Sequence, residues 1–358
     1  MLSNEKSLHA RARTRTATIA ALAAGATILA SCGGHSKPKA APTTSTTVPA
    51  TTTTTLPPTA PLTGLPQPDA AQLNATAVVV KIDNIDAARP QTGLSSADIV
   101  YEEQVEGGLT RLAAIFQSKY PTVLGPARSG RLTDRGIGDD LNHPVYAMSG
   151  TNLMFLPTLR AQPWWEVDDG NRPDLFYRAG SKPAPHNLYT NVVSLATAAK
   201  TPTPPAPLFQ YRPTGTPMTG AGVAPVTHFG FGFSHTSVTW DFSAQNNAWM
   251  RGQNGTADVD NTGAQLRATN VVVLFINYTI SGYATGEGGP PAAIPEGIMV
   301  GSGQAWFLSG NQVVKGTWTR TSLTTPATYA DSAGAPILLA PGNTWVELAQ
   351  AGTTPQLS

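Results

Sequence analysis

The sequence predicts an α+β first domain followed by a second domain that is mostly antiparallel β. Charged residues make up 13% of the 358 residues, roughly half the usual share, and the chain holds 34 Gly and 31 Pro. Short β-branched and aromatic runs alternate with turn residues. Helical bundles and coiled coils need many Lys, Glu, Arg and Leu, so this composition excludes them.

The N-terminus has the features of an export signal. Three arginines at alternate positions from Arg11 precede an uncharged run over residues 16–29, and small residues lead to Cys32. A basic region, a short apolar region and a small-residue cleavage site define a secretory signal, so residues 1–31 are predicted to be a signal peptide. The apolar run is shorter than the roughly 20 residues that a membrane-spanning helix needs.

The tetrapeptide Leu29-Ala30-Ser31-Cys32 resembles the lipobox of bacterial lipoproteins, in which the cysteine receives a diacylglycerol thioether. The resemblance implies a membrane anchor made of lipid, including palmitate-type acyl chains, on Cys32. It places the protein on the outer face of the cytoplasmic membrane or in the cell-wall space. The alternative is ordinary signal cleavage beside an unmodified cysteine. A single cysteine also excludes a disulfide scaffold and a multi-cysteine zinc site.

Residues 32–61 are predicted to form a solvated tether after the lipidated cysteine. Ten of the nineteen residues from Thr43 to Pro61 are Thr, and none is charged. Such a segment cannot bury a core. The body from Leu62 onward carries a net charge of about −4 and no basic stripe, which excludes nucleic acid as a partner.

The body is divided near residue 220. Residues 201–225 contain seven prolines, which is typical of a connection between domains or a long surface loop. Residues 62–220 carry 27 charged side chains and residues 221–358 carry 11. The prediction is therefore an α+β domain over 62–220 and a β domain over 221–358.

Short runs rich in Val, Thr and aromatic residues predict the strands of the second domain. They lie at residues 226–234, 237–242, 270–278, 298–308, 312–320 and 344–348. Turn residues at 309–311 indicate a hairpin between two of them. Because no long run has helical periodicity, a sandwich or an open barrel is expected.

The first domain mixes both kinds of element. Strands are predicted at residues 77–82, 97–105 and 109–116, and helices at residues 131–141 and 191–200. The apolar alternation places Ile99 opposite Ile115 and Glu103 opposite Arg111, which leaves residues 106–108 as a three-residue connection.

Two interpretations of the Glu103–Arg111 pair are open. It is either a half-buried structural ion pair, or Arg111 belongs to a cationic cluster with Arg128, Arg131 and Arg135.

An anion site is expected around Arg128, Ser129 and Arg131. These residues follow a strand and directly precede or begin the predicted helix. A helix N-terminus and neighbouring guanidinium groups both favour carboxylate or phosphate. Alternatively, Ser129 only caps the helix.

Seven motifs at residues 81–84, 88–94, 97–102, 105–111, 125–131, 184–189 and 341–346 carry a wider similarity. Together they resemble the YerB-type lipoproteins of bacteria, over nearly all of residues 62–358. The resemblance implies two linked domains on an exported, lipid-anchored protein, and it implies no particular reaction. Ala127 and Gly130 depart from the more usual Val and Ala of that family and leave the two arginines in register.

The resemblance favours Glu102 and Glu106, rather than Glu103, as functional carboxylates. On one strand their Cα atoms would be about 13 Å apart, beyond the roughly 5 to 9.5 Å between the carboxyl groups of glycosidase pairs. Glycoside hydrolysis is therefore a weak hypothesis.

His186 lies in a loop of turn residues, where it could act as a general base, bind a metal or simply hydrogen-bond the loop. The sequence contains no Walker loop, no His-Glu-x-x-His and no Gly-x-Ser-x-Gly. No metal and no cofactor are predicted.

Two functions are compatible with these patterns. The favoured one is a lipoprotein that binds an anionic small molecule, a cell-wall component or an envelope partner. Its candidate binding residues are Glu102, Glu106, Arg111, Arg128, Ser129 and Arg131. The alternative is an envelope hydrolase or transferase in which arginines hold an anionic substrate and Glu102, Glu106 or His186 moves protons. The first is favoured because the positive charge is visible, whereas a nucleophile with an oriented base is not.

Overall fold

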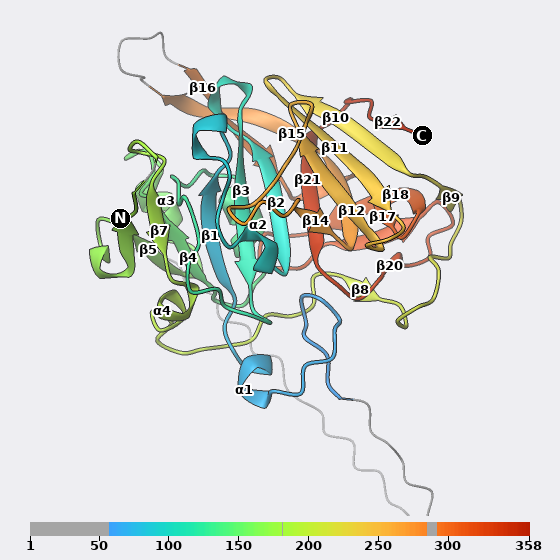
Figure 1. Cartoon of the computed structure of the whole chain (residues 1–358), viewed down its shortest axis with the longest axis horizontal. Helices are drawn as coiled ribbons and strands as arrows, with labels where there is room; N and C mark the ends of the chain where they lie inside the picture. The colour runs from blue at the N-terminus through green and yellow to red at the C-terminus, as the bar shows by residue number, and fades with distance from the viewer. Residues whose placement is uncertain (1–56, 181, 285–291) are drawn as a thin grey trace, which may run out of the picture. The chain divides into compact units, whose positions relative to one another are not determined.

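The computed structural model describes residues 57–180, 182–284 and 292–358 (Figure 1). These described residues all belong to one compact unit. The predicted signal peptide, Cys32 and most of the predicted tether lie outside the described residues. None of the helices in the described ranges is long and apolar enough to cross a membrane.

The folded part begins before Leu62. Ala60 is only 1% exposed, and Thr59 forms a β-bridge with Pro66. The tether prediction therefore extends a few residues too far, because the last Thr and Ala of the polar run fold back on the body.

A twelve-stranded sheet organises the unit (Figure 1). Its main path has the order β19-β18-β17-β15-β21-β2-β3-β1-β4-β5, with β16 paired to β15 and β9 to β18. The bounds are β1 Val78–Asp83, β2 Ile99–Gln104, β3 Thr110–Phe116, β4 Val145–Met148, β5 Trp165–Asp168, β9 Ala224–Pro225, β15 Asn270–Ala284, β16 Ala292–Ile298, β17 Gly301–Ser309, β18 Gln312–Arg320, β19 Thr328–Asp331 and β21 Thr344–Gln350. Strand β21 runs parallel to both β15 and β2, so strands from both halves of the sequence share one sheet.

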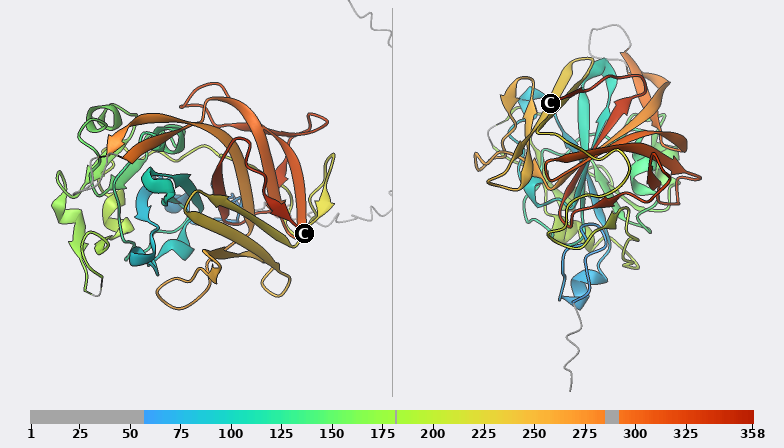
Figure 2. Two further views of the ribbon diagram at one scale, coloured as in Figure 1. Left: turned by 90° about the horizontal axis from the view of Figure 1, so that it is seen from above. Right: turned by 90° about the vertical axis from the view of Figure 1, so that its right-hand side faces the viewer.

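A second sheet has six strands in the order β13-β12-β11-β10-β22, with β14 paired to β12. Its bounds are β10 His228–Phe233, β11 Thr236–Ser243, β12 Ala248–Gln253, β13 Thr256–Ala257, β14 Arg267–Ala268 and β22 Gln356–Leu357. Two small sheets join β6 Phe176–Arg178 to β7 Leu188–Thr190 and β8 Gln210–Tyr211 to β20 Leu338–Leu339. The views in Figure 2 show the yellow and gold strands β10–β12 as a layer beside the large sheet.

Both faces of the large sheet are buried. On one face, Val80 and Val100 belong to a core that also contains Trp240 and Trp249 of the six-stranded sheet. On the other face, Val79, Ile99 and Ile115 belong to a second core, which also includes Ile137 of helix α2. Strands buried on both sides read as nearly continuous apolar runs, as β1 does.

The α+β prediction for the first half holds only in part, because the chain is dominated by strands. The α-helices are four or five residues long: α1 Ala70–Leu73, α2 Asp134–Gly138, α3 Leu156–Arg160 and α4 Val192–Ala196. Four 3₁₀ turns accompany them: η1 Asp86–Ala88, η2 Leu94–Ser96, η3 Glu106–Gly108 and η4 Pro173–Leu175.

The two predicted helices are therefore too long. Gly136 and Gly138 weaken α2, which stops well before Leu141. Helix α4 begins where Asn191 caps it, its Oδ1 accepting from the Val193 N–H at 2.9 Å.

The hairpin prediction is confirmed in detail. Ile99 pairs with Ile115 and Glu103 with Arg111, and the three-residue connection is η3. The six strands predicted in the second half correspond to β10, β11, β15, β17, β18 and β21. Strands β12 and β16 are not predicted from the sequence.

Candidate functional site

Arginines gather where β1 ends and β3 begins. Arg111 lies opposite Asp83 of β1 in the strand register. The segment that carries Arg128 runs alongside β1, because the Arg128 N–H donates to the Lys81 carbonyl at 2.8 Å. This antiparallel contact, and not a helix, brings Arg128 and Arg131 to the end of the sheet.

Glu106 joins two of the arginines. The Arg131 Nε donates to Glu106 Oε2 at 2.8 Å, its Nη2 donates to Oε1, and Arg111 Nη2 lies 3.5 Å from Oε1. Partial burial alone would raise the pKa of the Glu106 carboxyl. The hydrogen bonds and charge of Arg131, together with the charge of Arg111, outweigh burial and lower that pKa to about 2.

Arg111 is nearly buried, as is Arg131. Its Nη1 donates to the Ser129 carbonyl at 2.7 Å. Burial first, and then the charge of Arg131, lower the pKa of the Arg111 guanidinium to about 9, although Glu106 acts in the opposite direction. Positive charge is thus crowded at this point.

Asp83 connects Arg128 to His186. One carboxylate oxygen, Oδ2, lies 3.2 Å from Arg128 Nε and 2.8 Å from His186 Nδ1. The Asp83 side chain is 2% exposed, whereas Arg128 is 25% and His186 14% exposed. A buried carboxylate therefore orients two side chains that reach solvent.

We call Asp83, Glu106, Arg111, Arg128, Arg131 and His186 the arginine cluster. Three guanidinium groups face two carboxylates, which leaves one positive charge in excess before any charge on His186. The structure thus brings together five of the residues named from the sequence, Glu106, Arg111, Arg128, Arg131 and His186, with the Ser129 backbone beside them.

A buried ion triad lies behind the cluster. The Lys81 ammonium binds Glu103 and lies 2.7 Å from Asp134 Oδ1, and all three side chains are fully buried. Burial raises the pKa of Glu103 to about 7 against the opposing charge of Lys81. Glu103 does face Arg111 in the register, but its carboxylate pairs with Lys81. Of the two interpretations left open for this pair, the Glu103–Arg111 ion pair does not form, and Arg111 lies in a cluster with Arg128 and Arg131 but without Arg135.

Glu102 does not join the arginine cluster. Successive residues of a strand point to opposite faces, so Glu102 faces the six-stranded sheet. There it is fully buried, and its Oε2 accepts from Arg251 Nη2 at 2.6 Å. Glu106 reaches the cluster because it lies beyond the strand, in η3.

The expectation of a helix N-terminus at Ser129 is wrong. Helix α2 begins at Asp134, and the residue before it is Thr133. Ser129 contributes its backbone carbonyl, and Arg135 binds Glu296 of β16 instead of joining the cluster. The anion argument therefore rests on side chains alone.

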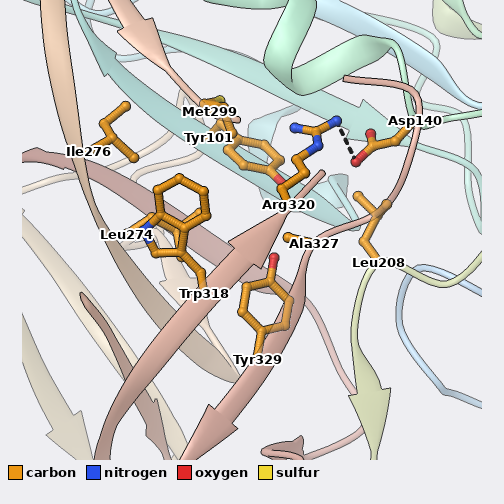
Figure 3. A pocket seen from close by; sticks show the side chains of 10 residues that line it. All are labelled: Tyr101, Asp140, Leu208, Leu274, Ile276, Met299, Trp318, Arg320, Ala327 and Tyr329. Carbon is orange, nitrogen blue, oxygen red and sulfur yellow. Dashed lines mark ion pairs between the residues drawn. The ribbon is translucent and has the colours of Figure 1, made fainter. Parts of the chain in front are cut away.

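A separate cavity lies between residues of both halves of the chain (Figure 3). It is lined by Tyr101, Asp140, Leu208, Leu274, Ile276, Met299, Trp318, Arg320, Ala327 and Tyr329. Arg320 Nη2 lies 2.9 Å from Asp140, whose pKa burial raises to about 7. The enclosed space of about 10 Å³ holds roughly one water molecule, so it is too small for an organic ligand.

No group of three or more His, Cys, Asp or Glu in the described part of the chain is placed to hold a metal ion. The residue that sequence reasoning missed is Asp83. Its signal was a carboxylate at the end of the mostly apolar strand predicted at residues 77–82, but its partner His186 is 103 residues away. Spacing cannot reveal such a contact.

Comparison with known proteins places these features in a family. Residues 62–204 match the N-terminal domain, and residues 229–346 the C-terminal domain, of a family described as "Protein of unknown function (DUF3048)". The chain is 38% identical over 144 residues to "Putative lipoprotein YerB" of Bacillus subtilis (strain 168). That alignment covers 39% of this chain and 42% of the relative.

The fold is also similar to a solved structure. The crystal structure of YerB protein from Bacillus subtilis superposes with a TM-score of 0.70 at 22% sequence identity, covering 84% of this chain and 99% of that one. Because the two domain profiles together span most of the sequence, the chain belongs to the DUF3048 family.

Proposed function

We propose that this chain is an exported, lipid-anchored protein of the bacterial cell envelope that binds an anionic ligand at its arginine cluster. The observation that carries the proposal is the charge imbalance at that place. Three arginines surround two carboxylates, and the most exposed of them, Arg128, is held by Asp83 through Nε. Guanidinium groups bind carboxylate and phosphate through paired hydrogen bonds.

Arg128 is the group best suited to reach a ligand. Among the described residues, its side chain forms one ion pair, to Asp83 through Nε, and neither Nη group forms a hydrogen bond, so both Nη groups retain their N–H donors. Arg111 and Arg131 are nearly buried and bind Glu106, so they supply positive field more than direct contacts.

The envelope location draws support from the lipobox-like Leu29-Ala30-Ser31-Cys32 and from the relative, whose name describes a lipoprotein. Two or more acyl chains hold a protein on a membrane, because each buried methylene contributes about 0.8 kcal/mol. The ligand would then be a carboxylate or phosphate compound of the envelope space.

A thermal-shift experiment tests the binding site. The purified chain is melted with and without succinate, inorganic phosphate and phosphorylated sugars. We expect at least one of these anions to raise the Tm of the wild type and to leave the Tm of Arg128→Ala unchanged, because binding to the native state stabilises it.

The matched control is Arg172→Ala. Arg172 is an exposed arginine that pairs with Asp174 away from the cluster, at 2.7 Å. This variant should keep the full anion response. Equal anion-induced shifts in wild type and Arg128→Ala would refute the site. Arg131→Ala is the poorer test, because it removes the main partner of Glu106 and weakens the fold.

A further inference from the structure

The contact between Asp83 and His186 has the geometry of an oriented base. His186 Nδ1 lies 2.8 Å from Asp83 Oδ2. An ionised carboxylate can only accept a hydrogen bond, so Nδ1 carries the imidazole proton. Nε2 of the neutral ring is then left with its lone pair. A carboxylate that fixes the tautomer of a histidine in this way is the arrangement that orients the general base in Ser-His-Asp triads.

Asp83 is itself fixed from several sides. Its backbone N–H donates to the Pro126 carbonyl at 2.9 Å, and its backbone carbonyl accepts from Gln91 Nε2 at 3.1 Å. The carboxylate also lies beside Arg128 Nε. The same oxygen therefore sets the positions of the imidazole and of the proposed anion-binding guanidinium relative to each other.

We infer that His186, positioned by Asp83, is the general base for hydrolysis of an ester or amide substrate. The same substrate carries a carboxylate or phosphate group that Arg128 binds. This inference rests on the proposed anion site and goes beyond binding. The proposed nucleophile is water, and among the described residues no serine, threonine or cysteine hydrogen-bonds His186.

The reaction needs no further reagent. His186 Nε2 takes a proton from water while the water oxygen bonds to the acyl carbon. The tetrahedral intermediate then collapses, the bond from the acyl carbon to the leaving oxygen or nitrogen breaks, and the imidazolium returns the proton to the leaving group. One water is consumed, and an acid and an alcohol or amine are produced.

The chain supplies its own matched control. His228 Nδ1 lies 2.7 Å from Asp241 Oδ1, so a second histidine–aspartate pair has the same contact. That pair joins β10 to β11 in the other sheet and is more exposed, and no arginine of the described ranges forms an ion pair with its carboxylate. If contact with an aspartate were enough to make a histidine a general base, His228 would contribute to hydrolysis as much as His186.

The experiment compares two acetyl esters with the purified chain, 3-acetoxybenzoate, which is anionic, and phenyl acetate, which is neutral. We expect kcat/KM to be about 10-fold or more higher for the anionic ester. His186→Gln should lower it by about 100-fold or more, the usual contribution of a general base. Arg128→Ala should remove the preference between the esters, and His228→Gln should change nothing.

Asp83 is tested as a positioning residue. Asp83→Asn should lower kcat and shift the pH profile of kcat, because the amide no longer fixes the tautomer, and Asp83→Glu should restore part of the rate. Hydrolysis of neither ester above the buffer rate, or equal rates in wild type and His186→Gln, would overturn the inference. The anion-induced Tm shift in the same samples reports separately on whether the binding site exists.

Discussion

Glu106 shows how a single residue can hold positive charges together. It accepts hydrogen bonds from Arg131 and lies near Arg111, and the positive charge of Arg128, three residues before Arg131, also acts on Arg111. Without Glu106, two nearly buried guanidinium groups would repel each other with no carboxylate between them. The stability of the site should therefore depend on the ionisation of this one side chain.

The pH dependence of that contribution has a definite sign. The fold lowers the pKa of Glu106 from 4.5 to about 2. The ionised carboxylate therefore stabilises the native state fully above about pH 4.5, and this contribution is lost as the pH falls toward 2. Glu106→Gln should lower the free energy of unfolding by about 1.5–3 kcal/mol at pH 7, the range for hydrogen bonds to charged groups.

Urea unfolding of the wild type and of Glu106→Gln, at pH 7 and near pH 2, measures the difference in their free energies of unfolding. This difference should nearly vanish at the lower pH. Asp174→Asn removes an exposed carboxylate that also pairs with an arginine, Arg172, and should change stability far less. A Glu106→Gln difference that is the same at both pH values would contradict the assignment.

The β2–β3 hairpin is the element that the sequence determines best. Its register follows from alternation between Ile99 and Ile115 and from the length of the connection, which are local features. The sequence determines the bounds of helix α2 less well, because these bounds depend on how residues 131–141 pack against the sheet. Long-range pairing, such as β21 between β15 and β2, has no local signal at all.

The same limit applies to the site. The sequence groups Arg128 and Arg131 because they are close in the chain, and it finds Arg111 through the hairpin. It mispairs Glu103, since Lys81 comes from β1 on the far side of β3 and only the assembled sheet shows that neighbour. The sequence also predicts the wrong location for Glu102. Whether the polar face of β2 is exposed or buried depends on the second sheet, which covers that face and cannot be located from the sequence.

In connection η3, alanine substitutions at two adjacent glycines should destabilise the protein by different amounts. Both have a positive φ, +70° at Gly107 and +68° at Gly108. A Cβ on Gly107 would have nothing closer than 4.0 Å, whereas one on Gly108 would lie 2.5 Å from Ser234 Cβ in the β10–β11 turn. Gly107→Ala should therefore cost about 1 kcal/mol, the penalty of left-handed backbone for a residue with a side chain, and Gly108→Ala should cost clearly more.

Chemical denaturation of the two variants measures these costs, and Gly107→Ala is the matched control. Equal destabilisation would show that the turn does not pack against the second sheet as described.

At the scale of the whole molecule, the two sheets are joined by buried charge. Arg251 of β12 binds Glu102 of β2 and Asp258, and all three side chains are fully buried. Glu347 of β21 lies in register beside Glu102, and burial together with the charge of Glu102 raises the pKa of its carboxyl. Trp240 Nε1 donates to Glu347 Oε1 at 2.8 Å, which ties β11 to the same network.

Removing the cation from this network should be costly. Arg251→Leu leaves Glu102 buried without its cation, while Asp258 keeps Arg89 as a partner. Removing one member of a buried ion pair costs about 3–5 kcal/mol. Arg267→Leu on β14 removes an exposed arginine from the same sheet and should have little effect. Guanidinium chloride unfolding compares the two. A loss below about 1 kcal/mol for Arg251→Leu would contradict the role of the network.

The central claim is that an anion binds beside Arg128. Diffraction from crystals of the chain soaked in selenate, a phosphate-sized dianion with an anomalous signal, tests it most directly. We expect an anomalous peak within hydrogen-bonding distance of Arg128 Nη1 or Nη2 and near His186, and no such peak in Arg128→Ala crystals. Selenate bound elsewhere with that place empty, or a peak that persists in the variant, would contradict the claim.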